Sequence, residues 1–420
     1  MKKDSRYYHR VLGKGFYVSN DTRSTMLNNN DLIIGSAGSA KTGSIVYAQL
    51  KSLKDSSLVV VDTKGRLCRM FEKELEAKGY EVLTLDFVNP ENSCIYNPLD
   101  YIRRTANGAA REQDITKLSA VLIAEELDVK EKFWTLSARG YLDFFVAYAM
   151  AALPKEDHNM YTVARLYRAF TDEYGELGFL SWLEHHQNSF AAIRYKEMQA
   201  SKSADKMVSS IYGFMNIALF PFDVAEFHQI FDPACAVRED GSKKKVLDIG
   251  MLGEKKTVLF LNISDTDHSC DLLVNLFYTQ CLQTLISKAD ENPDGQLKIP
   301  VRIMMDDFAS GTIIPDFDKI LSVVRSRDIW LTMCAQSFSQ LQSLYSREQA
   351  LTIVNNCDHI VYLGSNDLDS AQFIGTRAKK TPEMILAMDR TREYILEGGK
   401  PAILIDKIPP YSYEDSPEAG

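Results

Sequence analysis

The stretch that most constrains the fold of this 420-residue chain runs from Leu32 to Ile45 and reads LIIGSAGSAKTGSI. Its apolar start is typical of a buried strand, its Gly- and Ser-rich middle of a loop, and the residues from Lys41 onward of a helix. In a phosphate-binding loop of this kind, backbone N–H groups surround the phosphates, a lysine contacts them, and a hydroxyl holds Mg²⁺. The stretch therefore predicts an α/β fold with a nucleotide site.

The loop matches the phosphate-binding pattern at every position except one. The pattern GxxxxGKT becomes GxxxxAKT, with Ala40 in place of the second glycine. Since the chain passes closest to the phosphates at this point, the methyl group of Ala40 could crowd a nucleotide. The predicted nucleotide-binding residues are Gly35, Ser36, Ala37, Gly38, Ser39, Ala40, Lys41, Thr42 and Gly43.

Short apolar runs alternate with helical patterns on both sides of a long middle region. The runs include SSLVVVD and EVLTLDF before it, and KTVLFLNIS, IPVRIMMDD, DIWLTMCAQS, CDHIVYLG and PAILID after it. Continuous apolar strands separated by helices are characteristic of a parallel sheet that helices cover on both faces. We expect a mainly parallel central sheet of the P-loop NTPase type.

The middle region has a different pattern. In FWTLSARGYLDFFVAYAMAAL, apolar residues recur at intervals of three and four, as in a helix, and runs of β-branched residues disappear. This predicts an all-helical domain inserted into the α/β domain. The expected divisions are 1–104 and 246–408 for the nucleotide-binding domain, 105–245 for the insertion, and 409–420 for a disordered tail.

Composition narrows the class of protein. The formal net charge of -9 argues against a wholly basic nucleic-acid coat, and the seven cysteines form no CxxC pair. No run approaches the ~18 apolar residues that a membrane span requires. We expect a cytoplasmic protein, which partners could hold at the inner face of the cell membrane.

Two acids follow the apolar run VRIMM, at Asp306 and Asp307. In P-loop ATPases the first such acid orients Mg²⁺ through water, together with the loop hydroxyl, here Thr42. The second activates the attacking water, and it is usually a glutamate, so Asp307 is one methylene shorter. Solvated acids at the end of a strand are also common without any catalytic role.

A third element is VVRSRDIWLTMCAQS, in which Arg325 precedes a strand and Gln336 follows it. A glutamine beside the acid pair can sense the terminal phosphate or position water, and an arginine at a subunit edge can stabilise charge in a neighbouring subunit. Taken alone, either residue is more often structural.

With these elements in order, the chain resembles the TraG/TraD-type coupling proteins of type IV secretion and conjugation, especially those of Gram-positive mobile elements. The likeness covers nearly the whole sequence. It rests on the lead-in and loop DTRSTMLNNNDLIIGSAGSAKT, on VVVDTKGRL, IYNPLDYI and KFWTLSARGYL, and on the ordered motifs of the second half.

The resemblance implies a RecA-like nucleotide domain, an inserted substrate-recognition domain, and a homo-hexamer around a DNA channel. It also implies ATP and Mg²⁺ as cofactors, and pumping of single-stranded DNA with its bound relaxase toward a type IV secretion channel. Lys41 and Thr42 match the Walker A pair, and Asp306 and Asp307 stand at Walker B. Gln336 matches the motif glutamine, and Arg325 is the candidate charge-stabilising arginine.

The chain departs from the family pattern at several points. Ala40 and Asp307 replace a glycine and a glutamate, and Thr63 and Arg66 replace the proline and the acid of the DPKGE motif. The membrane helices that normally precede the nucleotide domain are not found. These departures leave open a weakly hydrolysing or inactive adaptor that recruits an active coupling protein, or a motor that works with a separate membrane subunit.

Two basic runs are candidates for DNA contact, residues 194–206 (RYKEMQASKSADK) and residues 375–380 (GTRAKK). Basic loops on a channel wall hold phosphates. Solvated helix faces explain such runs more often than DNA binding does.

Overall fold

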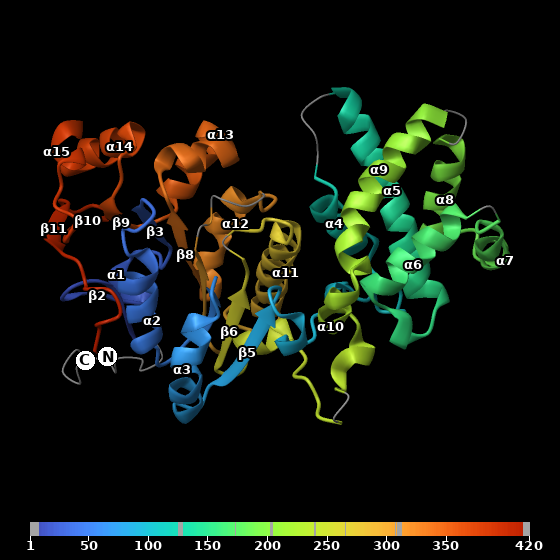
Figure 1. Ribbon diagram of the computed structural model, residues 1–420, viewed down its shortest axis with the longest axis horizontal. Coiled ribbons are helices and arrows are strands. Elements are labelled where there is room, and N and C mark those ends of the chain that lie inside the picture. Colours follow the sequence, from blue (N-terminus) through green and yellow to red (C-terminus); the bar gives the residue numbers. More distant parts are fainter. Residues whose placement is uncertain are drawn as a thin grey trace. The chain divides into compact units, whose positions relative to one another are not determined.

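The computed structural model describes residues 8–124, 129–172, 174–201, 205–238, 241–264, 266–306, 308 and 313–414, with backbone only for 129–131, 201 and 205–207. These residues form two compact units (Figure 1). Unit 1 takes Met1–Thr84, Asp248–His268 and Cys281–Gly420, and unit 2 takes Leu85–Leu247 and Ser269–Gln280. The sequence placed the domain boundaries at 104/105 and 245/246. These boundaries differ from the limits of the compact units and stay a prediction.

Unit 1 is built on a nine-stranded sheet in the order β11-β10-β9-β3-β8-β7-β4-β6-β5. Pairing is parallel from β9 through β3, β8, β7 and β4 to β6, and antiparallel between β9, β10 and β11. The mainly parallel sheet confirms the predicted α/β class. The strands are β3 (Asp31–Gly35), β4 (Ser57–Val61), β5 (Glu81–Asp86), β6 (Thr257–Asn262), β7 (Val301–Met305), β8 (Ile329–Ala335), β9 (His359–Gly364), β10 (Arg392–Glu397) and β11 (Ile403–Asp406).

Helices follow most of these strands in the chain. Every residue of β3, β4, β6, β7 and β8 is buried, as expected for strands covered on both faces. The helices of unit 1 are α1 (Thr22–Thr25), the π-helix η1 (Lys41–Val46), α2 (Tyr47–Lys51), α3 (Arg66–Ala77), α12 (Phe317–Val324), α13 (Phe338–Asn355), α14 (Leu368–Ala378) and α15 (Pro382–Leu386), and α11 (Asp271–Asp290) begins in unit 2 and ends in unit 1.

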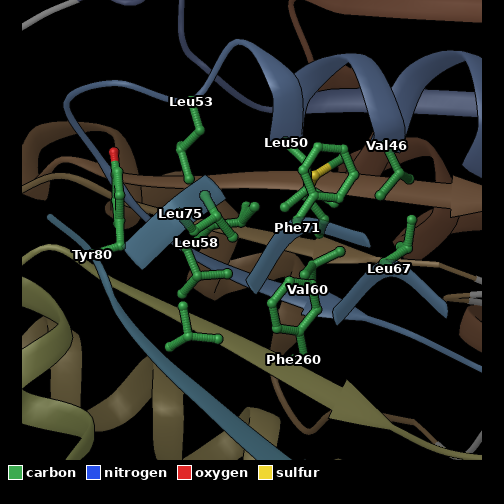
Figure 2. Packing of buried hydrophobic residues seen from close by; sticks show 13 residues of the cluster. Val46, Leu50, Leu53, Leu58, Val60, Leu67, Phe71, Leu75, Tyr80 and Phe260 are labelled. Carbon is green, nitrogen blue, oxygen red and sulfur yellow. The ribbon is translucent and has the colours of Figure 1, made fainter. Parts of the chain in front are cut away.

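Helix α3 shows how the sequence produces one layer of this core. Leu67, Phe71 and Leu75 recur every four residues and therefore lie on one face of the helix. Figure 2 shows this face packed over Leu58 and Val60 of β4. Burying a side chain of this size stabilises the fold by roughly 1.5–3 kcal/mol, so this face holds α3 against the sheet.

The amino-terminal end of α3 is capped by a buried acid. The Asp62 carboxylate, at the end of β4, accepts hydrogen bonds from the backbone N–H groups of Arg66 (2.9 Å) and Cys68 (2.8 Å). These bonds satisfy donors that have no partner within the helix. The turn between them passes through Gly65 in the left-handed region, with φ 57°. The motif VVVDTKGRL thus builds a strand end, a turn and a helix cap.

Three strands of unit 1 were not predicted. β1 (His9–Gly13) and β2 (Phe16–Ser19) form an antiparallel hairpin, and β10 pairs between β9 and β11. The runs HRVLG of β1 and REYILE of β10 contain charged residues that interrupt the apolar pattern, and β2 is only four residues long. The side chains of β1 and β10 are mostly buried by the folded sheet, whereas β2 is only partly buried, so local pattern alone does not reveal these strands.

A buried ionic network joins the amino ends of several strands. Asp31, at the start of β3, is fully buried and lies 3.0 Å from an Arg10 guanidinium nitrogen and 2.9 Å from one of Arg302. Arg10 also contacts Nδ1 of His359 at 3.0 Å. Burial and the neighbouring Arg10 lower the pKa of His359 to about 4, so this histidine is neutral at pH 7. The negative charge of Asp31 therefore faces the positive charges of Arg10 and Arg302.

Unit 2 contains the predicted helical region. Its helices are α4 (Glu112–Leu122), α5 (Val129–Ala152), α6 (Met160–Thr171), α7 (Leu177–His185), α8 (Phe190–Ser201), α9 (Asp205–Asp223) and α10 (His228–Phe231). Its core is aromatic. Phe144 and Phe145 of α5 are fully buried, and they lie edge-on to Phe170 of α6 at 6.2 and 5.4 Å between ring centroids. The all-helical insertion expected from the sequence is thereby confirmed.

Candidate functional site

The predicted phosphate-binding loop lies at the carboxyl end of β3. The loop closes on itself through a hydrogen bond from the Ser39 N–H to the Ser36 carbonyl at 3.1 Å, and the Ser36 N–H donates to the carbonyl of Gly364, the last residue of β9. At Gly35 a Cβ would lie 2.3 Å from the Ser39 Oγ and 2.9 Å from the Leu363 Cβ. Only glycine fits there, so the first glycine of the motif is required by packing.

The loop keeps its expected path even though the second glycine is missing. Gly38 has φ 75° and Ala40 has φ 73°, both in the left-handed region. This conformation costs a residue with a Cβ roughly 1–2 kcal/mol. A glycine would adopt this backbone conformation without strain. Ala40 adopts the same conformation with strain, so replacing the motif glycine by alanine does not change the path of the loop.

Lys41 begins the helix and is 8% exposed. Its ammonium group turns back into the loop and donates to the Gly35 carbonyl at 2.8 Å and to the Ser36 carbonyl at 3.5 Å. The cation is therefore held within the loop, where the first N–H groups of a helix also favour negative charge. The structure thus places the motif lysine within the loop, and its contact with phosphates stays a prediction.

Thr42 and Asp306 meet, although they are far apart in the sequence. The Thr42 hydroxyl donates to a carboxylate oxygen of Asp306 at 2.6 Å. Asp306 follows β7 directly, and the carboxyl ends of parallel strands lie at one edge of a sheet. A hydroxyl and a carboxylate oxygen are ligands that Mg²⁺ prefers. The structure brings together the two residues that the sequence proposed as metal ligands, and that role stays a prediction.

Gln336 lies at the same edge of the sheet. It follows β8, the strand between β3 and β7, so it stands between the loop and Asp306 in strand order. Its N–H donates to the Gln340 side chain at 3.1 Å. The second acid, Asp307, lies outside the described residues, and its role stays a prediction.

Arg325 lies near the amino-terminal end of β8, whereas the loop lies at the carboxyl-terminal end of the neighbouring strand β3. It precedes β8 in a short turn, and its guanidinium donates to the Met26 carbonyl at 3.1 Å. Seven residues of strand, roughly 23 Å at the usual rise, separate it from Gln336. Arg325 therefore does not join the loop of its own chain.

Residues 2–381 match the family model for type IV secretory system conjugative DNA transfer. The chain belongs to this family. The likeness to TraG/TraD-type coupling proteins is thereby confirmed.

The fold of this coupling protein is also found in solved structures. The bacterial conjugative coupling protein TrwBdeltaN70, unbound, has a TM-score of 0.69 at 14% identity, with 96% of this chain and 89% of that chain covered. TrwB in complex with the ATP analogue ADPNP has a TM-score of 0.70 at 14% identity, with 94% and 88% covered.

A more distant similarity is to VirB4 of Thermoanaerobacter pseudethanolicus, with a TM-score of 0.52 at 12% identity and 98% and 97% of the two chains covered. At these identities the similarity shows the fold alone. No curated protein matches the sequence of this coupling protein.

Sequence reasoning missed one component of the site, the segment after β11. Residues from 409 onward were expected to be a disordered tail, yet in the structure Tyr413 is buried beside Val11 and Ala48. Lys407, just before the segment, donates to the Leu363 carbonyl at 2.6 Å and to the Ser39 carbonyl at 3.5 Å. Two tyrosines within KIPPYSY were the available signal for packing. Residues 415–420 lie outside the described part.

The two basic runs are partly used within the protein. Arg194 lies 3.1 Å from Asp143, which is 1% exposed, and 2.7 Å from Glu197. Arg377 stacks on the Phe373 ring at 3.8 Å, and burial lowers its pKa. Residues 202–204 lie outside the described part. DNA contact at either run stays a prediction.

Within the described residues, no single helix of this coupling protein has the length and apolar character of a bilayer span. The bent pair Val208–Asp223 and Ala225–Phe231 passes the same test only when both helices are taken together.

Proposed function

We propose that this coupling protein is an ATP-driven motor that moves single-stranded DNA, with its bound relaxase, toward a type IV secretion channel. The observation that carries the proposal is the Thr42–Asp306 hydrogen bond beside the loop that holds Lys41. It joins the two motifs that a P-loop ATPase needs at one place. Membership of the conjugative DNA-transfer family supports the substrate class.

The residues of the loop fit a nucleotide with Mg²⁺. Lys41 supplies a buried cation for the phosphates, and Thr42 and Asp306 supply two oxygen ligands 2.6 Å apart. Bound Mg²⁺ would neutralise charge on the phosphates. TrwB, which shares the fold, has been solved with ADPNP and with ADP and Mg²⁺. We therefore assign ATP and Mg²⁺ to this site.

Hydrolysis requires groups that orient water and stabilise charge. Asp306 would hold the metal, Asp307 would act as the base, and Gln336 would position water at the same sheet edge. Arg325 lies at the other edge and reaches a nucleotide only from a neighbouring subunit. This placement supports a ring, for which we propose a homo-hexamer.

The remaining assignments follow from the family. We propose that the inserted helical region recognises the relaxase or DNA, that channel components receive the complex, and that the host element belongs to the Gram-positive branch. A cytoplasmic motor of this kind would act at the inner face of the membrane through partners, including a separate membrane subunit.

A second candidate is an adaptor that binds relaxase or DNA and recruits an active coupling protein. The observation in its favour is the strained Ala40, whose methyl group occupies the position of the loop glycine. The shorter Asp307 at the catalytic position points the same way. An adaptor of this kind would bind nucleotide weakly and hydrolyse it slowly.

The test is the ATPase rate of the purified protein with and without single-stranded DNA. For a motor, we expect DNA to raise the rate, and Lys41→Ala to lower it by roughly 10²-fold or more, since a preorganised charge is lost. Lys400→Ala, an exposed lysine in the turn after β10, is the matched control and should leave the rate unchanged.

The two candidates give opposite results in this experiment. A wild-type rate that neither responds to DNA nor falls in Lys41→Ala would exclude the motor and favour the adaptor. A DNA-stimulated rate that Asp306→Asn abolishes would exclude the adaptor.

A further inference from the structure

We infer that Arg66 and Tyr411 form a stacking platform for the purine base of the bound nucleotide. The inference rests on the proposed nucleotide site and deepens it, by assigning a base-binding function to the carboxyl-terminal segment. Arg66 replaces the acid of the motif DPKGE, and Tyr411 belongs to the stretch predicted to be disordered. Neither residue is used by the phosphate site described above.

The segment from Ile408 to Tyr411 lies across the first turn of the phosphate-loop helix. The Ser44 hydroxyl donates to the Ile408 carbonyl at 2.6 Å, and the Tyr411 N–H donates to the Gly43 carbonyl at 2.9 Å. Ser44 is fully buried beneath this contact. Two hydrogen bonds therefore attach the segment to the residues that directly follow Lys41 and Thr42.

Gly43 records how close this approach is. A Cβ at Gly43 would lie 2.9 Å from the Pro410 Cβ and 3.2 Å from a ring carbon of Tyr411. Any larger residue would push the segment away from the helix. The glycine after the Walker A threonine thus permits the segment to lie next to the phosphate loop.

The ring of Tyr411 is fixed in place from two sides. The guanidinium carbon of Arg66 lies 4.2 Å from its centroid, and the Tyr47 ring meets it edge-on at 5.6 Å. The backbone of Tyr411 is in the left-handed region, with φ 59°. A non-glycine residue adopts that conformation only where its surroundings hold it. The guanidinium lies over one face of the ring, so the two groups form a stacked layer of a cation and an aromatic ring.

The position of this layer fits the base rather than the phosphates. The loop backbone surrounds the α- and β-phosphates, and the lysine and Mg²⁺ ligands mark the side of the terminal phosphate. Gly43 follows those ligands in the helix, so the nucleoside would leave the loop on the side where Pro410 and Tyr411 lie. Arg66 is exposed there and available to a ligand.

Planar cationic and aromatic groups bind bases through their faces. Because every base offers such a face, stacking alone does not distinguish adenine from guanine. The platform therefore binds ADP and GDP with similar affinity, whereas inorganic tripolyphosphate, which has no base, depends on the loop alone.

The experiment measures dissociation constants of ADP, GDP and tripolyphosphate for the full chain by calorimetry in the presence of Mg²⁺. We expect Tyr411→Ala to raise the dissociation constants of ADP and GDP about tenfold each. The dissociation constant of tripolyphosphate should stay within about twofold of the wild-type value. Tyr411→Phe keeps the ring and should bind ADP as the wild type does. Arg66→Ala should show the same selective loss to a smaller extent.

Tyr174→Ala, which removes a 72% exposed tyrosine of unit 2, is the matched control and should change none of the three constants. If Tyr411→Ala lowered the affinities for ADP and tripolyphosphate equally, the segment would only support the loop, and the base-stacking proposal would be wrong. Unchanged ADP binding would also overturn it. A wild type that binds none of the three ligands would instead show that the proposed nucleotide site is wrong, and the platform would fail with it.

Discussion

At the scale of single residues, the loop shows that an alanine can follow a glycine path. Ala40 has φ 73°, close to the 75° of Gly38, because the flanking hydrogen bonds of the loop and the start of η1 define the backbone there. The free energy of this strain lowers the stability of the folded state. A protein that keeps such a residue stores the strain at the site where ligand contacts form.

Ala40→Gly should therefore stabilise the protein. Relief of roughly 1–2 kcal/mol of strain exceeds the roughly 0.5–1 kcal/mol that glycine costs through the entropy of the unfolded chain. We expect a net gain of about 0.5–1 kcal/mol, measured by urea denaturation, with tighter ADP binding. Ala37→Gly is the control in the same loop. Ala37 has no positive φ, so its replacement should give no gain. Equal effects of both changes would show that Ala40 is not strained.

At the scale of elements, the antiparallel edge of the sheet supports the phosphate loop. β10 and β11 lie beyond β9, and β11 leads directly into Lys407, which donates to the carbonyls of Leu363 and Ser39. Burial lowers the pKa of Lys407, and the nearby Glu393 of β10 opposes that shift. The edge thus places the buried Glu393 near the half-buried Lys407, and Lys407 reaches the loop.

Glu393 gives this edge a pH dependence. The side chain is fully buried, and its two carboxylate oxygens have no hydrogen-bond partner among the residues that the structure describes. Burial raises its pKa to about 8. A pKa above the unfolded value of 4.5 means that the unfolded chain releases the proton first. The stability contributed by the protonated acid is therefore present below pH 4.5 and lost as the pH rises toward 8.

Glu393→Gln, which mimics the protonated form, should be more stable than the wild type at pH 7, by an amount on the order of 3 kcal/mol. At pH 4.5 the two should be nearly equal. Denaturation midpoints across this range measure the difference. Asp406→Asn, at an exposed site of β11, is the control substitution. A stability difference between Glu393→Gln and the wild type that stays constant with pH would refute the raised pKa.

At the scale of the whole molecule, the chain forms two compact units, and the proposed nucleotide site lies within unit 1. The loop, Asp306, Gln336 and the platform all belong to unit 1, whereas unit 2 is built on an aromatic helical core. A ligand stabilises the part of a protein that must be folded to bind it. Bound nucleotide should therefore stabilise unit 1 against unfolding more than it stabilises unit 2.

Tryptophan fluorescence can measure this difference in stabilisation because the three tryptophans are divided between the two units. Trp330 lies in unit 1, and Trp134 and Trp182 lie in unit 2. ADP at 100 times its dissociation constant should stabilise unit 1 by about 2.7 kcal/mol. The unfolding midpoint of a variant that retains Trp330 alone should rise accordingly, and that of a variant retaining Trp182 alone should rise less. Equal shifts would mean that the units unfold as one.

Much of the fold and of the site was predictable from local pattern. The apolar parallel strands, the helical insertion, and the path from Gly35 to Thr42 depend on residue spacing and on loop glycines, which act over a few residues. The meeting of Thr42 with Asp306 was also predictable, since parallel strands end at a common edge.

Other features were decided only by the tertiary structure. The burial of Asp31 with Arg10 and Arg302, the edge strand β10 and the contact of Tyr411 with Gly43 and Arg66 join segments that are distant in the chain. No local spacing encodes such contacts, because each depends on which surfaces the folded sheet brings together. The sequence by itself therefore determined the class of fold and the phosphate loop, and the tertiary structure decided what surrounds that loop.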